Sequence, residues 1–400
     1  MPPRSRPLAT AALALVGLTA CAAIPEPVDA AADAHGYVEG ATEATEPQLT
    51  LATIDAAGTL ALLDLLDETT TPVAVIEGAT AVSTDGRFVF ASSASAAGSG
   101  DLTIVDTGVW TVDHQDHSHY YRAEPRVVGA LEGAGAAVVT GGGSTVAVTS
   151  PDGGAVLLDH AALGTGEIER VGEIAGATVA APVGSAVLAG IGDTAVVATP
   201  TGETTAEAAC PDPAGSIGTR VGTVIGCADG AVLATSDADG TVTLEHTPYP
   251  RAVATGDRAV EFRGRAGRPT VAAVAGSTGA WLLDTRERSW TLLPTEVPLL
   301  LVAAADDSDG RIVALAADGR VLVLDPTTGA TVAATAPLLA ATVADPALLA
   351  GVELSVDANR AYVNAPAEGV VYELDYADSA RVARTFPVPG SPVFVAETGR

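Results

Sequence analysis

Half of the histidines in this chain lie in one short segment, "DHQDHSHYYR", at residues 113–122. The segment offers three imidazoles and two carboxylates, which belong to His114, His117, His119, Asp113 and Asp116. Zinc in proteins takes four such ligands in a tetrahedral arrangement. Residues two apart in an extended segment face the same way, so His117 and His119 can converge while His114 and either aspartate complete the set. The segment therefore predicts a zinc site, and the alternative is a long solvated loop that is merely rich in histidine.

The rest of the chain carries little that could perform catalysis. We find no G-x-S-x-G, H-E-x-x-H, P-loop or dinucleotide-binding pattern in it. The remaining histidines are far from one another along the chain, and we interpret them as isolated histidines rather than as ligands: His35, His160 and His246. We therefore predict that the protein is not an enzyme.

The N-terminus resembles a bacterial export signal. Arg4 and Arg6 precede the apolar stretch "PLATAALALVGLTA", which is too short to span a bilayer. The stretch ends in "LTAC", which resembles a lipobox, so residues 1–20 are predicted to be a lipoprotein signal peptide and Cys21 the lipidated first residue. A plain signal peptide cut nearby is the alternative. The protein is expected outside the cytoplasm, held at the cell membrane only through its lipid.

Two further segments follow from composition. The segment 21–48 is acidic and carries no basic residue, which is typical of a flexible tether, and residues 49–400 form the predicted folded domain. Two cysteines remain there, Cys210 and Cys227, and an exported protein meets an oxidising compartment. Their spacing is not the C-x-x-C of zinc or redox centres, so we predict a structural disulfide.

The charge of the chain limits its partners. The formal net charge is −29, and all 20 basic residues are arginine. A field of this sign repels the phosphate backbone, which argues against nucleic acid as a partner. Aromatic residues make up only 4% of the chain, so a buried core must consist mainly of alanine, valine and leucine.

One phrase recurs along the folded domain: a Gly or Asp turn followed by an apolar run that often ends in Asp. The copies are "GTLALLDL" (58–65), "GDLTIVDT" (100–107), "GGAVLLDH" (153–160), "GDTAVVAT" (192–199), "DGAVLATS" (229–236), "TGAWLLDT" (278–285), "DGRVLVLD" (318–325) and "EGVVYELD" (368–375). Intervals of roughly 35–55 residues are typical of β-propeller blades, each a four-stranded antiparallel sheet. Helical periodicity is nearly absent, the short "DHAALG" being the one candidate.

The two ends of the domain fit the closure of a ring. The first unit, from "LTLATI" to "VAVIEG", provides three strands, and the last unit leaves "SPVFVAETG" over. "PVFVAE" can therefore complete the N-terminal blade and leave no open sheet edge. We predict an all-β, eight-bladed β-propeller, with seven blades as the alternative because "GDTAVVAT" and "DGAVLATS" match the phrase poorly.

Three stretches together, "DHQDHSHYYRAEPRVVG", "AACPDPAGSIG" and "VIGCADGAVL", resemble the AztD-type extracytoplasmic zinc metallochaperones. The resemblance covers about residues 48–400. It implies a β-propeller that binds zinc and passes the ion to the solute-binding protein of a zinc ABC transporter. It also maps the family's His/Asp-rich loop onto residues 113–119 and its cysteine pair onto Cys210 and Cys227.

This sequence departs from the family at the histidines expected on inner strands. Ala136 or Ala137 stands where one histidine is expected, "AGATVAAPV" lacks a His-His pair, and Ala214 and Ser216 replace a His and a Glu. We therefore predict a monomeric, divergent zinc-binding lipoprotein that holds one weakly bound zinc ion through a loop that orders only on binding. The alternative is a non-catalytic propeller scaffold that has lost metal binding.

Overall fold

The computed structural model describes residues 39–400 except 96–99, 115–116 and 136. The chain divides into a short N-terminal unit, residues 1–37, and a second unit, residues 38–400, which holds all the described residues. The predicted signal peptide, Cys21 and the first part of the predicted tether lie outside the described residues. Among the residues that are described, no helix combines the length and the apolar character needed to cross a membrane.

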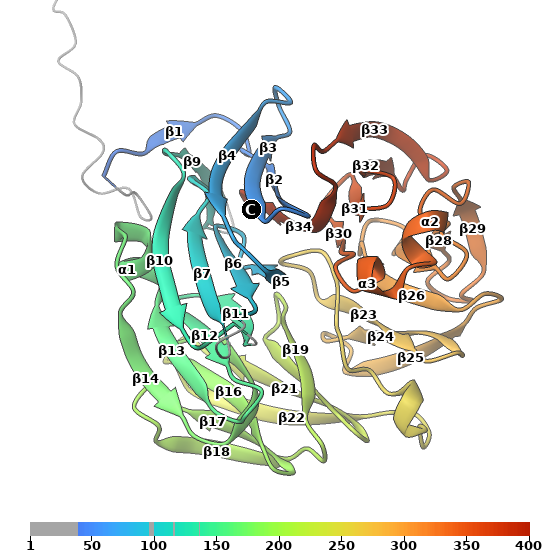
Figure 1. Ribbon diagram of the computed structural model, residues 1–400. Coiled ribbons are helices and arrows are strands. Elements are labelled where there is room, and N and C mark those ends of the chain that lie inside the picture. The colour runs from blue at the N-terminus through green and yellow to red at the C-terminus, as the bar shows by residue number, and fades with distance from the viewer. Residues whose placement is uncertain (1–38, 96–99, 115–116, 136) are drawn as a thin grey trace, which may run out of the picture. The chain divides into compact units, whose positions relative to one another are not determined.

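The second unit is all-β and consists of small antiparallel sheets that follow one another along the chain (Figure 1). The first sheet has the order β34-β2-β3-β4, with β2 (Thr50–Asp55), β3 (Thr59–Asp64), β4 (Thr70–Val75) and β34 (Pro392–Thr398). The second has the order β10-β7-β6-β5, with β5 (Ala79–Thr84), β6 (Phe88–Ser93), β7 (Asp101–Asp106) and β10 (Arg126–Glu132).

The next three sheets each contain four strands in sequence order. The third contains β11 (Val138–Gly142), β12 (Thr145–Thr149), β13 (Ala155–Asp159) and β14 (Arg170–Ile174). The fourth contains β15 (Ala177–Val183), β16 (Ala186–Ile191), β17 (Thr194–Ala198) and β18 (Thr204–Ala209). The fifth contains β19 (Ala214–Gly218), β20 (Thr223–Cys227), β21 (Gly230–Ser236) and β22 (Val242–Pro248).

The sixth sheet has three strands, β23 (Thr270–Ala275), β24 (Gly279–Asp284) and β25 (Ser289–Pro294). At its inner edge, Arg263 forms a single antiparallel bridge to Ala272 of β23, and the next residue, Gly264, bridges to Ala304 in the seventh sheet. The seventh sheet contains β26 (Leu299–Ala304), β27 (Ile312–Ala316), β28 (Val321–Leu324) and β29 (Thr331–Ala334). The eighth contains β30 (Leu354–Val356), β31 (Ala361–Ala365), β32 (Val370–Asp375) and β33 (Arg381–Pro387).

Each copy of the recurring phrase forms a strand at the same place in its sheet. The copies contribute β3, β7, β13, β17, β21, β24, β28 and β32, each of which lies next to the outermost strand. The two copies that match poorly, at 192–199 and 229–236, belong to separate four-stranded sheets, as β17 and β21. The phrase therefore marks one strand in each of these eight sheets, because its continuous apolar run suits a strand that is covered on both faces.

The C-terminal strand completes the first sheet, as the sequence predicts. β34 pairs antiparallel with β2, with Thr398 opposite Thr50 and Val395 opposite Thr53. The hydroxyls of Thr50 and Thr398 lie 2.6 Å apart in the buried part of this pairing. The strand thus covers the edge of β2, which would otherwise expose unpaired backbone groups.

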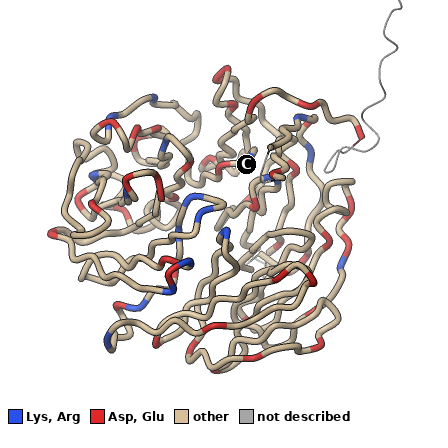
Figure 2. The backbone as a smooth tube through the Cα atoms, turned by 180° about the vertical axis from the view of Figure 1, so that it is seen from behind, with Lys and Arg blue, Asp and Glu red and all other residues tan. Residues whose placement is uncertain are grey.

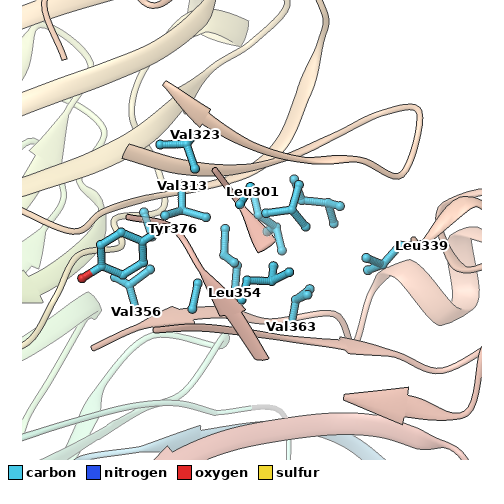
Figure 3. Close-up of a cluster of buried hydrophobic side chains, with 14 of the residues drawn as sticks. Leu301, Val313, Val323, Leu339, Leu354, Val356, Val363 and Tyr376 are labelled. Carbon is cyan, nitrogen blue, oxygen red and sulfur yellow. The ribbon is translucent and has the colours of Figure 1, made fainter. Parts of the chain in front are cut away.

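Small aliphatic side chains fill the space between neighbouring sheets. Figure 3 shows such a cluster between the seventh and eighth sheets, where Leu301 and Val313 face Leu354 and Val363. The predicted core of alanine, valine and leucine is therefore present, because facing sheets pack closely when their inner side chains are short. Acidic residues are spread along the whole folded unit (Figure 2), and a few of them, including Glu373 and Glu397, are buried in ion pairs with arginine.

Helices are few and short in the part of the chain that the structure describes. The predicted "DHAALG" segment forms α1 (His160–Thr165), whose first turn is capped by the Asp159 carboxylate accepting from the Ala162 N–H at 2.7 Å. Two four-residue helices, α2 (Ala340–Val343) and α3 (Pro346–Leu349), and the 3₁₀ turn η2 (Thr255–Asp257) have no counterpart in the sequence prediction. Segments of three or four residues are too short to show helical periodicity.

Candidate metal centre

The histidine-rich segment forms a β-hairpin. β8 (Val109–Asp113) and β9 (Ser118–Arg122) pair antiparallel, with Val112 opposite His119. The backbone N–H of His114 donates to the carbonyl oxygen of His117 at 2.9 Å and closes the turn. The hairpin is an insertion between β7 and β10 of the second sheet and belongs to a separate three-stranded sheet. In the described residues the segment is therefore a strand hairpin and not a long solvated loop, and ordering of the site on zinc binding stays a prediction.

The hairpin brings the three predicted histidines together. The ring centroids of His114 and His117 lie 5.0 Å apart, those of His117 and His119 lie 5.0 Å apart, and those of His114 and His119 lie 5.3 Å apart. One ring nitrogen from each residue lies within 4.8 Å of the other two. Of the two predicted aspartates, Asp113 is exposed at the end of β8, and Asp116 lies outside the described residues.

The three imidazoles suit a zinc ion. Zinc–nitrogen bonds of about 2.1 Å at tetrahedral angles place neighbouring ligand atoms about 3.4 Å apart. The ligand atoms of the three histidines lie within 4.8 Å of one another, so only a small approach separates them from this spacing. Three nitrogen ligands leave a fourth position for a carboxylate or for water, which is the arrangement of an accessible zinc site.

A carboxylate that the sequence analysis missed lies beside the cluster. Glu43 belongs to β1 (Thr42–Ala44), which pairs with β9 and forms the third strand of this small sheet (Figure 1). An oxygen of Glu43 lies 2.6 Å from Nδ1 of His119. Residues 42–44 fall in the predicted flexible tether, whereas the structure places them in a strand. The difference arises because β9 offers a free edge to which even an acidic segment can pair.

Buried aromatic rings stabilise the hairpin. The rings of Trp110 on β8 and Tyr121 on β9 stack with centroids 5.3 Å apart, and both side chains are buried. The guanidinium of Arg87 lies 3.8 Å from the Trp110 ring centroid and forms a buried ion pair with Asp106 at 2.8 Å. Burial, with a smaller contribution from the negative charge of Glu43, raises the pKa of Tyr121. These contacts limit how far the histidine-bearing turn can move.

Polar contacts join the hairpin to the first sheet and to the C-terminus. The Thr111 hydroxyl donates to the carbonyl oxygen of Gly399 at 2.8 Å, and its N–H donates to the carbonyl oxygen of Arg400 at 3.3 Å. Arg122 donates to the buried carboxylate of Asp64 at 2.7 Å. The candidate site is therefore attached to the body of the unit at both strands.

A second group of metal-binding residue types, Cys227, Asp229 and His246, lies in the fifth sheet. Cys227 forms a disulfide with Cys210, with Cα atoms 5.0 Å apart, so its sulfur is not free to act as a thiolate ligand. His246 lies 3.0 Å from Asp229 and forms an ion pair with it when protonated. The disulfide joins the segment after β18 to β20 and thereby ties the fourth sheet to the fifth, as the sequence predicts.

The remaining described histidine has a structural role. His160 opens α1, and its Nε2 lies 3.2 Å from the buried carboxylate of Asp85. Its ring also meets the Phe88 ring edge-on, with centroids 5.1 Å apart. No other metal-binding side chain joins this pair in the described part of the chain.

The inner strands carry no imidazole where the family resemblance leads one to expect it. Of the two candidate positions before β11, Ala136 lies outside the described residues and Ala137 directly precedes the strand, while the other positions fall within β15 and β19. The described residues of these three strands are Ala, Val, Thr, Gly, Pro, Ser and Ile. A cavity of about 310 Å³ opens beside these strands, lined by residues such as Thr140, Ala181 and Gly218. Such a lining offers hydroxyl and backbone groups and no strong zinc ligand.

Comparison with known proteins identifies structures that share this fold. No protein-family model and no curated protein matches this chain. Among solved structures, AztD from Citrobacter koseri and apo AztD from the same organism each superpose with a TM-score of 0.70 at 20% identity, covering 88% of this chain and 97% of theirs. Sqt1 from Saccharomyces cerevisiae gives a TM-score of 0.52 at 13% identity, over 83% of this chain and 94% of that one. The chain therefore has an AztD-type β-propeller fold.

Proposed function

We propose that this protein binds zinc through the β8–β9 hairpin and acts as an extracytoplasmic zinc metallochaperone. The observation that carries the proposal is the convergence of His114, His117 and His119, whose ligand nitrogens lie within 4.8 Å of one another. The resemblance of the sequence to AztD-type metallochaperones and the shared fold support it. Zinc is then the cargo, and an accessible three-histidine site suits an ion that has to be handed on.

The setting of the protein rests on two resemblances, that of "LTAC" to a lipobox and that of the folded domain to AztD-type proteins. We propose that Cys21 carries lipid and anchors the chain outside the cytoplasm, and that the recipient of the ion is the solute-binding protein of a zinc ABC transporter. No chemical step is needed for this role, which agrees with the absence of recognisable enzyme motifs in the sequence. A monomer suffices, because one hairpin supplies all three imidazoles.

For the architecture we propose eight blades in a closed ring. Two features support this count. Each of the eight phrase copies forms the strand next to the outermost one in a separate sheet, and β34 pairs with β2 across the two ends of the domain. The sixth blade would then use the bridged segment at Arg263 and Gly264 as its innermost strand.

Zinc titration of the purified protein by calorimetry tests the proposal. We expect one equivalent to bind at neutral pH, and more weakly than in a propeller that adds inner-strand histidines. The double variant His117→Ala/His119→Ala should abolish uptake, because a single imidazole of the cluster remains. His246→Ala is the matched control and should leave uptake unchanged, since His246 lies in a different sheet. Tight uptake that survives the double variant would place the site elsewhere.

The second candidate is a non-catalytic scaffold, and the lack of imidazoles on the inner strands favours it. If the propeller retains the fold but not the metal, the unmodified protein takes up no zinc in the same titration. That result would overturn the chaperone proposal and leave the cavity beside β11, β15 and β19 as the surface to examine for a ligand.

A further inference from the structure

We propose that Glu43 is a positioning residue for the zinc site, so that docking of β1 on the hairpin and binding of zinc reinforce each other. The proposal rests on the proposed zinc function and adds a regulatory element to it. Its basis is the 2.6 Å contact between the Glu43 carboxylate and Nδ1 of His119. A carboxylate that accepts the Nδ1–H of an imidazole fixes its tautomer and orientation and raises the basicity of Nε2, which is then the ligand atom.

The register of β1 shows that this contact is built by the strand and not by chance rotation of an exposed side chain. Glu43 stands opposite Tyr121 on β9, and Tyr121 shares a face of β9 with His119 because the two residues are two apart. The His119 and Tyr121 rings stack with centroids 6.3 Å apart. Glu43 therefore reaches His119 diagonally across the strand pair, a distance that a long side chain can span.

β1 itself is held by few contacts. It comprises three residues, Thr42, Glu43 and Ala44, paired to β9, with the Thr42 hydroxyl donating to the Arg122 carbonyl oxygen at 3.2 Å. The one buried apolar residue beside it, Ala41, packs on Trp110 and Tyr121. A strand of this length has little stability of its own, so a contact with His119 that strengthens on metal binding can shift its docking equilibrium.

Linkage makes the effect reciprocal. If a docked β1 raises the zinc affinity of the hairpin by some factor, then bound zinc favours docking of β1 by the same factor. Undocking of β1 is thereby a route to release of the ion without any change in the propeller sheets.

Three measurements on the purified protein test this inference, using zinc alone as the probe. Glu43→Gln keeps an acceptor oxygen but loses the charge, and we expect it to weaken zinc binding by about 10- to 100-fold, as loss of such a partner does at other metal sites. Glu46→Gln is the matched control, since it removes one negative charge from the same exposed segment. It should change the affinity by less than about twofold, because a single exposed charge beyond contact distance is well screened.

Hydrogen exchange distinguishes the positioning role from a purely structural one, because a structural role of Glu43 would not make the exchange of β1 depend on zinc. Zinc should slow exchange of the amides of residues 42–44 in the unmodified protein but not in Glu43→Gln. In a His119→Ala background, Glu43→Gln should have no further effect on zinc affinity, because the positioned ring is gone. Substituted cobalt should show the same visible spectrum in the unmodified protein and in Glu43→Gln, since Glu43 is not itself a ligand.

The outcomes separate this inference from the function on which it rests. No zinc uptake by the unmodified protein overturns both. Uptake that is equal in the unmodified protein and Glu43→Gln, or equal losses in Glu43→Gln and Glu46→Gln, overturns the positioning role alone. A changed cobalt spectrum in Glu43→Gln also overturns it, because Glu43 would then be a direct ligand.

Discussion

At the scale of single residues, Asn364 is the side chain that joins the last sheet to the C-terminal strand. It is fully buried on β31, where its Nδ2 donates to the carbonyl oxygens of Gly351 at 3.0 Å and Pro392 at 2.9 Å. Its Oδ1 accepts from the N–H of Glu353 at 2.8 Å. One amide thus satisfies backbone groups of two segments that arrive from different directions.

Replacing Asn364 with alanine should lower the free energy of unfolding by about 2–4 kcal/mol, because buried backbone groups would lose their partners. Urea unfolding followed by tryptophan fluorescence measures this loss. Asn359→Ala provides the control, since Asn359 is exposed in the turn before β31 and its removal should cost less than about 0.5 kcal/mol. Equal effects of the two substitutions would contradict the role assigned to Asn364.

At the scale of elements, the β8–β9 hairpin depends on its buried aromatic base. Trp110→Ala removes the ring that lies against both Tyr121 and Arg87 and leaves a cavity worth about 3–5 kcal/mol. We expect it to weaken zinc binding as well, because the turn that carries the histidines would lose its support. Trp290→Ala in the sixth sheet is the matched comparison: it should destabilise the protein similarly yet leave zinc affinity unchanged. Zinc titration and thermal unfolding of both variants decide the point.

At the scale of the whole folded unit, stability depends on the pairing of its two ends. Val395 on β34 is buried in a cluster with Leu51 and Tyr362, which belong to the first and eighth sheets. Val395→Asp should cost more than about 4 kcal/mol and promote aggregation, because it buries a charge and frees the edge of β2. Val332→Asp, at an exposed site on β29, should change stability by less than about 0.5 kcal/mol. Size-exclusion chromatography and thermal unfolding compare them, and a well-folded, monomeric Val395→Asp protein would refute the prediction.

Much of this protein follows from the sequence by itself. Short apolar runs and the spacing of the turns predict the strands, and the repeated phrase predicts one strand in every sheet except the small sheet of β1, β8 and β9. The three histidines converge as predicted because they lie within six positions of one another, where a hairpin turn is enough to bring them together. The disulfide was also predictable, because Cys210 and Cys227 are the two cysteines of the folded domain. The return of the C-terminal strand to β2 was predictable because the first unit provides three strands and lacks a fourth.

Only the tertiary structure revealed the contacts that join segments distant in the chain. Glu43 lies 76 residues from His119 and belongs to a segment whose composition is typical of a tether. Its role depends on the register of β1 against β9, which no local pattern specifies. The same holds for Asn364, whose partners come from two separate segments. Local periodicity determines which residues form a strand, whereas the packing of one strand against another determines which side chains meet.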